Sequence, residues 1–180
     1  IFARPETGKT TFCAHLCASY IKNKHKVVYW ANEDKASKIK LRIIQSYYRA
    51  TKQEMIDDKT IIHESYIKDI KPYFTLVDSV GSSVEELNQY CKLAEPDIVF
   101  ADQLDKFSVR GDFGRGDERL KEIYIKAREI AKRNDLLFWA VSQANYEAHN
   151  RMSIDFSMMD GSRTGNCLLY TSDAADEGWC

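Results

Sequence analysis

Residues 3–10 carry the clearest chemical pattern in the sequence, ARPETGKT. They match the phosphate-binding loop G-x-x-x-x-G-K-[ST], except that Ala3 replaces the first glycine. In such a loop, backbone N–H groups around Gly8 surround phosphate oxygens, Lys9 reaches the terminal phosphates, and the Thr10 hydroxyl is a ligand of Mg²⁺. The pattern predicts a nucleotide site with these phosphate-contacting residues: Arg4, Pro5, Glu6, Thr7, Gly8, Lys9, Thr10 and Thr11. The alternative is a chance turn with a surface lysine.

Three polar residues stand where apolar, strand-like runs end. Asp102 ends one run, a position that suits a carboxylate ligand of Mg²⁺, although a strand-end Asp can also simply cap the next turn. Glu33 follows another run and suits a general base that orients water, and Gln143 closes a third, where its amide would register a γ-phosphate. Asp105 is expected to be a solvated loop charge. The candidate catalytic residues are Glu33, Lys9 and Gln143, and the candidate metal ligands are Thr10 and Asp102.

Strand-like and helix-like patterns alternate along the chain. Continuous β-prone runs predict buried strands at 27–31 and 97–102 and further strands at 74–77 and 136–141, after a short first strand at 1–3. Helical spacing of apolar residues predicts one helix that ends at 22 and three more at 35–50, 83–93 and 118–133. Capping boxes are predicted at Ser83 and at Thr51, where a shorter helix would begin. This alternation predicts an α/β fold, a mostly parallel sheet with helices on both faces. Its ligands are expected beyond the carboxyl ends of the strands.

The overall composition is that of an ordinary globular domain. Of the 180 residues, 44% are hydrophobic, and 26 Lys and Arg balance 27 Asp and Glu. These values exclude collagen-like, low-complexity and wholly disordered chains, and also a uniformly basic protein that coats nucleic acid. No run of about 18 apolar residues is present, so we expect an intracellular protein without a membrane-spanning helix.

The cysteine pattern indicates neither a disulfide scaffold nor a metal site. The five cysteines, an odd count, are Cys13, Cys17, Cys91, Cys167 and Cys180. Cys13 and Cys17 lie four residues apart on one predicted helix face, which would present two ligands, but no second pair completes a site. Reduced thiols are expected, with these two as small buried apolar groups.

The ordered set of strand-end residues resembles the RecA-type P-loop ATPase core, specifically that of the DnaB-like hexameric replicative helicases, including phage relatives. The passages that carry the resemblance are ARPETGKTTF, VVYWANED, FTLVDSVGSSVEEL, DIVFADQLDKF, WAVSQANYEAHNR and, at 158–165, MMDGSRTG. Within them, Glu33 matches the family's catalytic glutamate, Asp102 its magnesium-site aspartate and Gln143 its γ-phosphate-sensing glutamine.

The resemblance implies an ATP-dependent DNA helicase that uses ATP and Mg²⁺, assembles as a hexameric homo-oligomer and moves along single-stranded DNA during replication. It implies a cytoplasmic location, in a bacterial cell or a phage-infected host. It also places two loops towards the DNA channel, and their arginines, Arg110, Arg115, Arg151 and Arg163, are the candidate DNA contacts. Alternatively, these arginines are ordinary solvated charges on surface loops.

The resemblance covers residues 1–165, which we interpret as a partial ATPase domain. Residues 166–180 show no helical or strand period, and their run CLLYTSDAADE resembles a translated sequencing adapter, so we expect a non-native or disordered tail. The family continues beyond this point to a trans-acting arginine finger. Because loss of such a finger costs orders of magnitude in turnover, weak or no hydrolysis is expected of this stretch alone.

Two other functions fit the same loop. A RecA-type recombinase or a clock-like regulatory ATPase shares the fold and the glutamate, and a non-hydrolysing nucleotide-binding module would use ATP only to hold an assembly together. The passages FTLVDSVGSSVEEL and MDGSRTG favour the helicase. Glu33 argues against the non-hydrolysing module, because a pure binder needs no general base.

Overall fold

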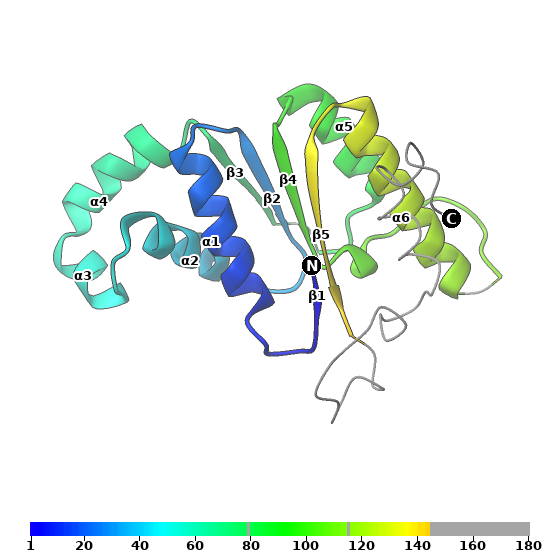
Figure 1. The fold of residues 1–180 in the computed structure, drawn as a ribbon, viewed down its shortest axis with the longest axis horizontal. Helices are drawn as coiled ribbons and strands as arrows, with labels where there is room; N and C mark the ends of the chain where they lie inside the picture. Colours follow the sequence, from blue (N-terminus) through cyan, green and yellow to red (C-terminus); the bar gives the residue numbers. More distant parts are fainter. Residues whose placement is uncertain (79, 115, 145–180) are drawn as a thin grey trace, which may run out of the picture.

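The computed structural model of the chain describes residues 1–78, 80–114 and 116–144, and shows one central sheet between two layers of helices (Figure 1). The strands are β1 (Phe2–Ala3), β2 (Val27–Ala31), β3 (Phe74–Asp78), β4 (Ile98–Asp102) and β5 (Leu137–Gln143). The α-helices are α1 (Lys9–Lys22), α2 (Ala36–Tyr48), α3 (Lys52–Asp57), α4 (Lys59–Ser65), α5 (Val84–Ala94) and α6 (Gly116–Arg133). Two short turns complete the set, the π-helical η1 (Tyr66–Ile70) and the 3₁₀ helix η2 (Leu104–Lys106).

All pairings in the sheet are parallel, and the strand order is β1-β5-β4-β2-β3. The register brings the carboxyl ends together: Ala31 pairs with both Asp78 and Asp102, and Ala3 pairs with Gln143. Since β5 lies between β1 and β4, the end of β5 stands between the phosphate-binding loop and Asp102. This confirms the predicted α/β class and the predicted parallel sheet, whose strands end at one common edge.

Each face of the sheet packs against its own pair of helices. Val28 and Trp30 of β2 pack with α5 and α6 in one buried cluster, while Val27, Tyr29 and Ala31 pack with α1 and α2 in another. Because successive side chains of a strand point to opposite faces, a strand covered on both faces must be apolar at every position. This explains the unbroken run VVYWA, all of which is buried.

Two of the helices, α3 and α5, begin at a side-chain cap. At Thr51 and Ser83, the side chain accepts the backbone N–H three residues later, and Glu54 and Glu86 return the contact to the cap. Both predicted capping boxes are thus confirmed, and the predicted helices begin or end within two residues of the observed ones. The segment from α4 to η1 has no counterpart in the sequence-based prediction.

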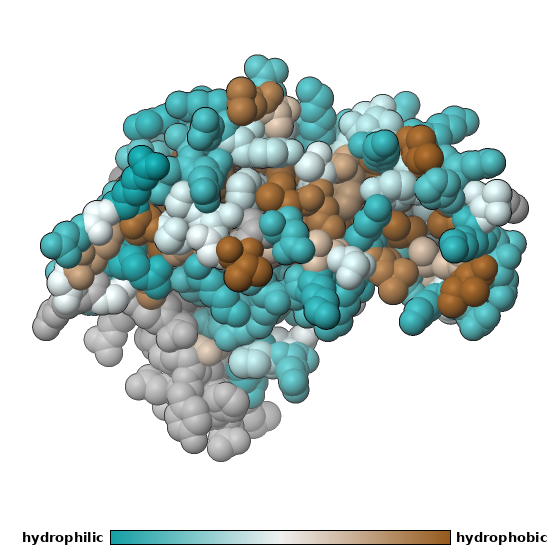
Figure 2. Space-filling model, turned by 180° about the vertical axis from the view of Figure 1, so that it is seen from behind, coloured by the Kyte–Doolittle hydropathy of each residue, from teal (hydrophilic) through white to brown (hydrophobic). Residues whose placement is uncertain are grey.

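The three cysteines within the described residues are free and buried: Cys13, Cys17 and Cys91. Among these described residues, no cluster of His, Cys, Asp and Glu suits a metal ion, and no helix is long and apolar enough to cross a membrane. The large apolar side chains that are exposed are Phe12, Ile56, Ile67, Val80, Leu93 and Leu137. On the face seen in Figure 2, apolar residues form separate areas among hydrophilic ones, as is usual for a protein surface.

Candidate nucleotide site

The loop between β1 and α1 has the backbone shape of an anion cradle. Gly8 caps α1 in the left-handed conformation with φ 91°, and Glu6 is also left-handed with φ 60°. The Thr7 hydroxyl donates to the Arg4 carbonyl at 2.7 Å and closes the turn. Ala3 has no positive φ and ends a strand, so the missing first glycine costs the loop no backbone strain.

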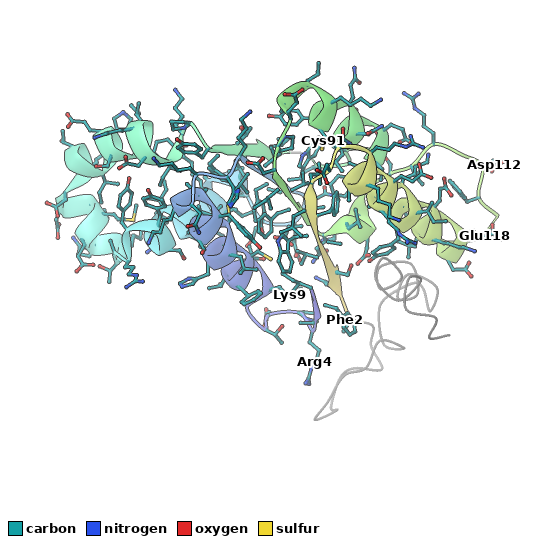
Figure 3. The ribbon with its side chains drawn as sticks, turned by 45° about the horizontal axis from the view of Figure 1, so that its top comes forward. Phe2, Arg4, Lys9, Cys91, Asp112 and Glu118 are labelled. Atoms are coloured by element: carbon teal, nitrogen blue, oxygen red, sulfur yellow. The ribbon has the colours of Figure 1, made fainter. Side chains whose placement is uncertain are left out.

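Lys9 is the first residue of α1 and lies largely buried, at 9% exposure. Its Nζ donates to the carbonyls of Ala3, at 3.1 Å, and Arg4, at 2.8 Å. Burial lowers the pKa of Lys9, while the negative charges of Glu33 and Asp102 act in the opposite direction. Figure 3 shows Arg4 and Lys9 at the same end of the molecule as Phe2, where the loop follows the first strand. The ammonium group is therefore held inside the loop that it would share with phosphate oxygens.

Asp102 and Thr10 meet at the end of β4. Asp102 is 1% exposed, and its Oδ2 accepts hydrogen bonds from the Tyr29 hydroxyl at 2.7 Å and the Thr10 hydroxyl at 3.3 Å. The other oxygen, Oδ1, is buried and has no hydrogen-bond partner. Burial raises the pKa of Asp102, and the hydrogen bond from Tyr29 opposes that rise.

A buried carboxylate oxygen without a partner, beside a threonine hydroxyl, fits the hard oxygen ligands that Mg²⁺ prefers. A magnesium ion bound with a nucleotide keeps several waters and takes its other ligands from the phosphates, so few protein ligands are needed. Thr10 and Asp102 would hold such an ion here. Tyr29, which sequence reasoning did not single out, would orient Asp102 from beneath.

Glu33 lies two residues beyond the end of β2 and is contacted from three sides. Gln143 donates its side-chain N–H to Oε1 at 3.1 Å, and Gln103 donates to Oε2 in a short contact. The ammonium group of Lys106 lies 3.8 Å from Oε1. The structure thus brings the predicted pair Glu33 and Gln143 into direct contact, and adds Gln103 and Lys106, which the sequence patterns did not reveal.

A cavity of about 540 Å³ opens over the loop. Of the residues expected around a nucleotide, it is lined by Pro5, Glu6, Gly8, Lys9, Thr10, Thr11, Glu33 and Gln143. Its remaining walls are Asp34, Lys38 and Arg42, where the carboxylate of Asp34 pairs with Lys38 at 3.0 Å and with Arg42 at 2.9 Å. These two cations of α2 were missed because helical spacing alone reads them as a solvated face.

The prediction that Asp105 is a solvated loop charge is wrong. Its Oδ1 accepts hydrogen bonds from the hydroxyls of Tyr124, at 2.5 Å, and Ser142, at 3.1 Å. Its Oδ2 accepts the backbone N–H of Gln143 at 3.4 Å. Asp105 was misread because a loop position in sequence gives no sign that α6 and β5 converge on it. It ties η2 to the end of β5.

Only one of the four candidate DNA contacts falls within the described residues. Arg110 is exposed, and its backbone N–H donates to the Glu85 carboxylate at 3.3 Å. Asp112, on the same loop, lies well away from Lys9 in Figure 3. The other three candidates, Arg115, Arg151 and Arg163, lie outside the described residues, as do the passage at 158–165 and the tail at 166–180.

The parallel sheet and the phosphate-binding loop at its carboxyl edge define a P-loop nucleotide-binding domain of RecA-like fold. The family model described as the DnaB-like helicase C terminal domain matches residues 1–160, and the chain belongs to this family of P-loop ATPases. A comparison with curated protein sequences found no match.

Two of the solved structures that are similar in fold show the extent of the likeness. One is described as an ATPase domain, with a TM-score of 0.77 and 18% identity, and the alignment covers 93% of this chain and 64% of that one. The other is a DnaB-like replicative helicase studied for its interactions with primase, with a TM-score of 0.78, 18% identity and coverage of 98% and 47%. This chain therefore spans between about half and two thirds of the length of these solved relatives.

Proposed function

We propose that this chain is the ATPase motor of a replicative DNA helicase, which hydrolyses ATP with Mg²⁺ to move along single-stranded DNA and separate the duplex. The observation that carries the proposal is the meeting of four kinds of group at one sheet edge. A phosphate-binding loop, a buried aspartate, a glutamate and a glutamine lie around one cavity of about 540 Å³ or directly beneath it. Membership of the DnaB-like helicase family supports DNA as the track.

Each residue has a defined task in this proposal. The loop N–H groups and Lys9 bind the phosphates, and Thr10 with Asp102 holds the metal, which neutralises charge on the transferring phosphoryl group. Glu33 accepts the proton of the attacking water, since its carboxylate lines the same cavity as Lys9 and Thr10. The amide of Gln143 already contacts Glu33, so the approach of a γ-phosphate would redirect it and report the nucleotide state to β5.

In the assembled protein, we propose a homo-oligomeric ring, with a hexamer as the form typical of the family, around single-stranded DNA. Arg110, Arg115, Arg151 and Arg163 would contact DNA phosphates without reading sequence, as a motor requires. The exposure of Arg110 is compatible with this role. No feature of the described site specifically favours the alternative functions, which are a recombinase, a regulatory ATPase and a non-hydrolysing module.

ATP hydrolysis by the full-length protein, with and without single-stranded DNA, tests the function. Glu33→Gln should lower kcat by roughly 10²-fold or more while nucleotide binding persists, because the base is lost and the phosphate contacts remain. Lys9→Ala should weaken nucleotide binding itself. Glu118→Gln and Lys121→Ala, exposed residues of α6, serve as matched controls and should behave as wild type. Hydrolysis that DNA does not stimulate would argue strongly against a motor.

A further inference from the structure

We propose that Gln103 is a positioning residue that holds the carboxylate of Glu33 in place for catalysis. This inference rests on the proposed function, because it assigns Gln103 a task only if Glu33 is the general base. Gln103 directly follows Asp102 in the chain, and its side-chain amide donates to Oε2 of Glu33. Neither the loop pattern nor the strand-end pattern assigns this residue any role.

Gln103 is almost completely withdrawn from water. Its exposure is 2%, and its neighbours Asp102 and Leu104 are buried at 1% and 0%. A polar side chain that is withdrawn from water needs a hydrogen-bond partner, and the partner found for this amide N–H is the carboxylate of Glu33. The backbone on either side is anchored in β4 and η2, so the amide is a fixed point rather than a mobile one.

Glu33 needs such a fixed point, because its own position leaves its carboxylate free to turn. Glu33 lies beyond the end of β2, and its side chain is 37% exposed. A carboxylate in this position can rotate among several conformations, whereas a general base must face one water molecule. A fixed donor on one oxygen leaves the other oxygen, Oε1, to the contact at 3.1 Å with Gln143, which lines the cavity.

The other two contacts of Glu33 cannot do the same work. Gln143 is the residue proposed to turn towards the γ-phosphate, so its contact is lost when positioning matters most. Lys106 lies 3.8 Å from Oε1 and its side chain is 48% exposed, and ion pairs of this kind contribute little in water. Gln103 is therefore the contact that persists through the cycle.

The test is a double-mutant cycle in the full-length protein. Gln103→Leu and Gln103→Met each remove the amide donor and keep an apolar side chain that suits a buried position. A hydrogen bond to a charged group that is lost in the transition state should cost roughly 10- to 100-fold in kcat. KM and the affinity for a fluorescent ATP analogue should stay within about 2-fold, because the phosphate contacts are untouched. In the Glu33→Gln background, either substitution should have no further effect on hydrolysis.

Gln53 provides the matched control. Its side-chain amide also donates to a carboxylate, that of Asp57 at 2.9 Å, but on the exposed helix α3. Gln53→Leu should leave hydrolysis unchanged. Nucleotide binding and the thermal midpoint show whether each variant is folded, and two substitutions at Gln103 guard against failure of one.

The outcomes separate the inference from the function on which it rests. If Glu33→Gln lowers kcat to a small measurable residual rate but folded Gln103 variants keep the wild-type kcat, or lose activity additively with Glu33→Gln, the positioning role is overturned and the motor proposal stands. If Glu33→Gln itself hydrolyses ATP at the wild-type rate, the general-base role of Glu33 and the positioning role of Gln103 are both overturned, whereas stimulation by DNA still decides the motor function. A fall in kcat at constant KM that vanishes in the Glu33→Gln background supports the positioning role.

Discussion

Single buried contacts determine what the carboxylates of the site can do. Asp102 has one oxygen occupied by Tyr29 and Thr10 and one oxygen without a partner, so it presents a single defined ligand position. Tyr29 is itself fully buried and stacks on Phe100, with ring centroids 5.5 Å apart. Burial and the nearby charge of Asp102 raise the pKa of Tyr29 well above its usual value, which keeps its hydroxyl a proton donor to Asp102.

Tyr29→Phe should weaken the apparent affinity for Mg²⁺ by roughly 10-fold, since outer partners of metal ligands typically contribute on this scale. The ring remains packed on Phe100, so we expect the fold and the metal-free binding of nucleotide to be unchanged. A magnesium titration of nucleotide binding, with an EDTA baseline, measures the effect. The control is Tyr90→Phe, whose ring packs against Trp30 on the opposite face of the sheet. Equal magnesium affinity in Tyr29→Phe and the wild type would refute this orienting role.

At the scale of the elements, parallel register and helix caps place these side chains. Ala31 of β2 pairs with Asp102 of β4, so Glu33 and Asp102 reach the same edge of the sheet. Helix α5 begins at the capping box of Ser83, and Ser83 also forms an isolated β-bridge with Ser108. Since α5 packs beside α6 over one face, its start helps define how that layer sits on the sheet.

Ser83→Ala should lower the free energy of unfolding by about 1 kcal/mol, because the backbone N–H of Glu86 loses its acceptor. Urea denaturation followed by circular dichroism measures the change. Ser37→Ala, in the first turn of α2 rather than at its cap, should stay within about 0.5 kcal/mol of the wild type. If the two substitutions cost the same, the stabilising role of the cap is wrong.

At the scale of the whole molecule, two apolar layers enclose the thiols of the described residues. Burial raises the pKa of Cys13 to about 12 and that of Cys91 to about 11, and it raises the pKa of Cys17 well above its usual value. Cys13 and Cys17 belong to the layer under α1, and Cys91 belongs to the layer under α5. In Figure 3, Cys91 lies well away from Lys9, the first residue of α1. Labelling of Cys91 therefore reports on one layer, and labelling of Cys13 and Cys17 reports on the other.

We expect these three thiols to resist alkylation in the folded protein at pH 8. With pKa values raised this far, the reactive thiolate is roughly one part in a thousand or less at that pH, and it increases as the pH rises towards the pKa. Reaction should therefore require unfolding and should accelerate sharply in denaturant. Peptide mapping by mass spectrometry follows each cysteine and keeps the three apart from Cys167 and Cys180. Rapid labelling of Cys13 or Cys91 without denaturant would contradict the buried placement.

The sequence by itself determined the class of fold and the residues at the ends of the strands. A short, β-prone run that is apolar at every position indicates a strand covered on both faces, and polar residues that follow several such runs emerge at one edge of a parallel sheet. The placement of Glu33, Asp102 and Gln143 at this edge was predictable on these grounds alone, and that of Lys9 followed from the loop pattern. The caps were equally predictable, because a cap and its partner lie three residues apart.

Only the tertiary structure decided which side chains hold these groups in place. The contacts of Tyr29 with Asp102 and of Gln103 with Glu33 join residues 73 and 70 positions apart, and Asp105 meets Gln143 across 38. Periodicity identifies an element and its buried face, but it carries no information on which residues of distant elements come opposite one another. That depends on the strand order and register, which place β5 between the phosphate-binding loop and β4.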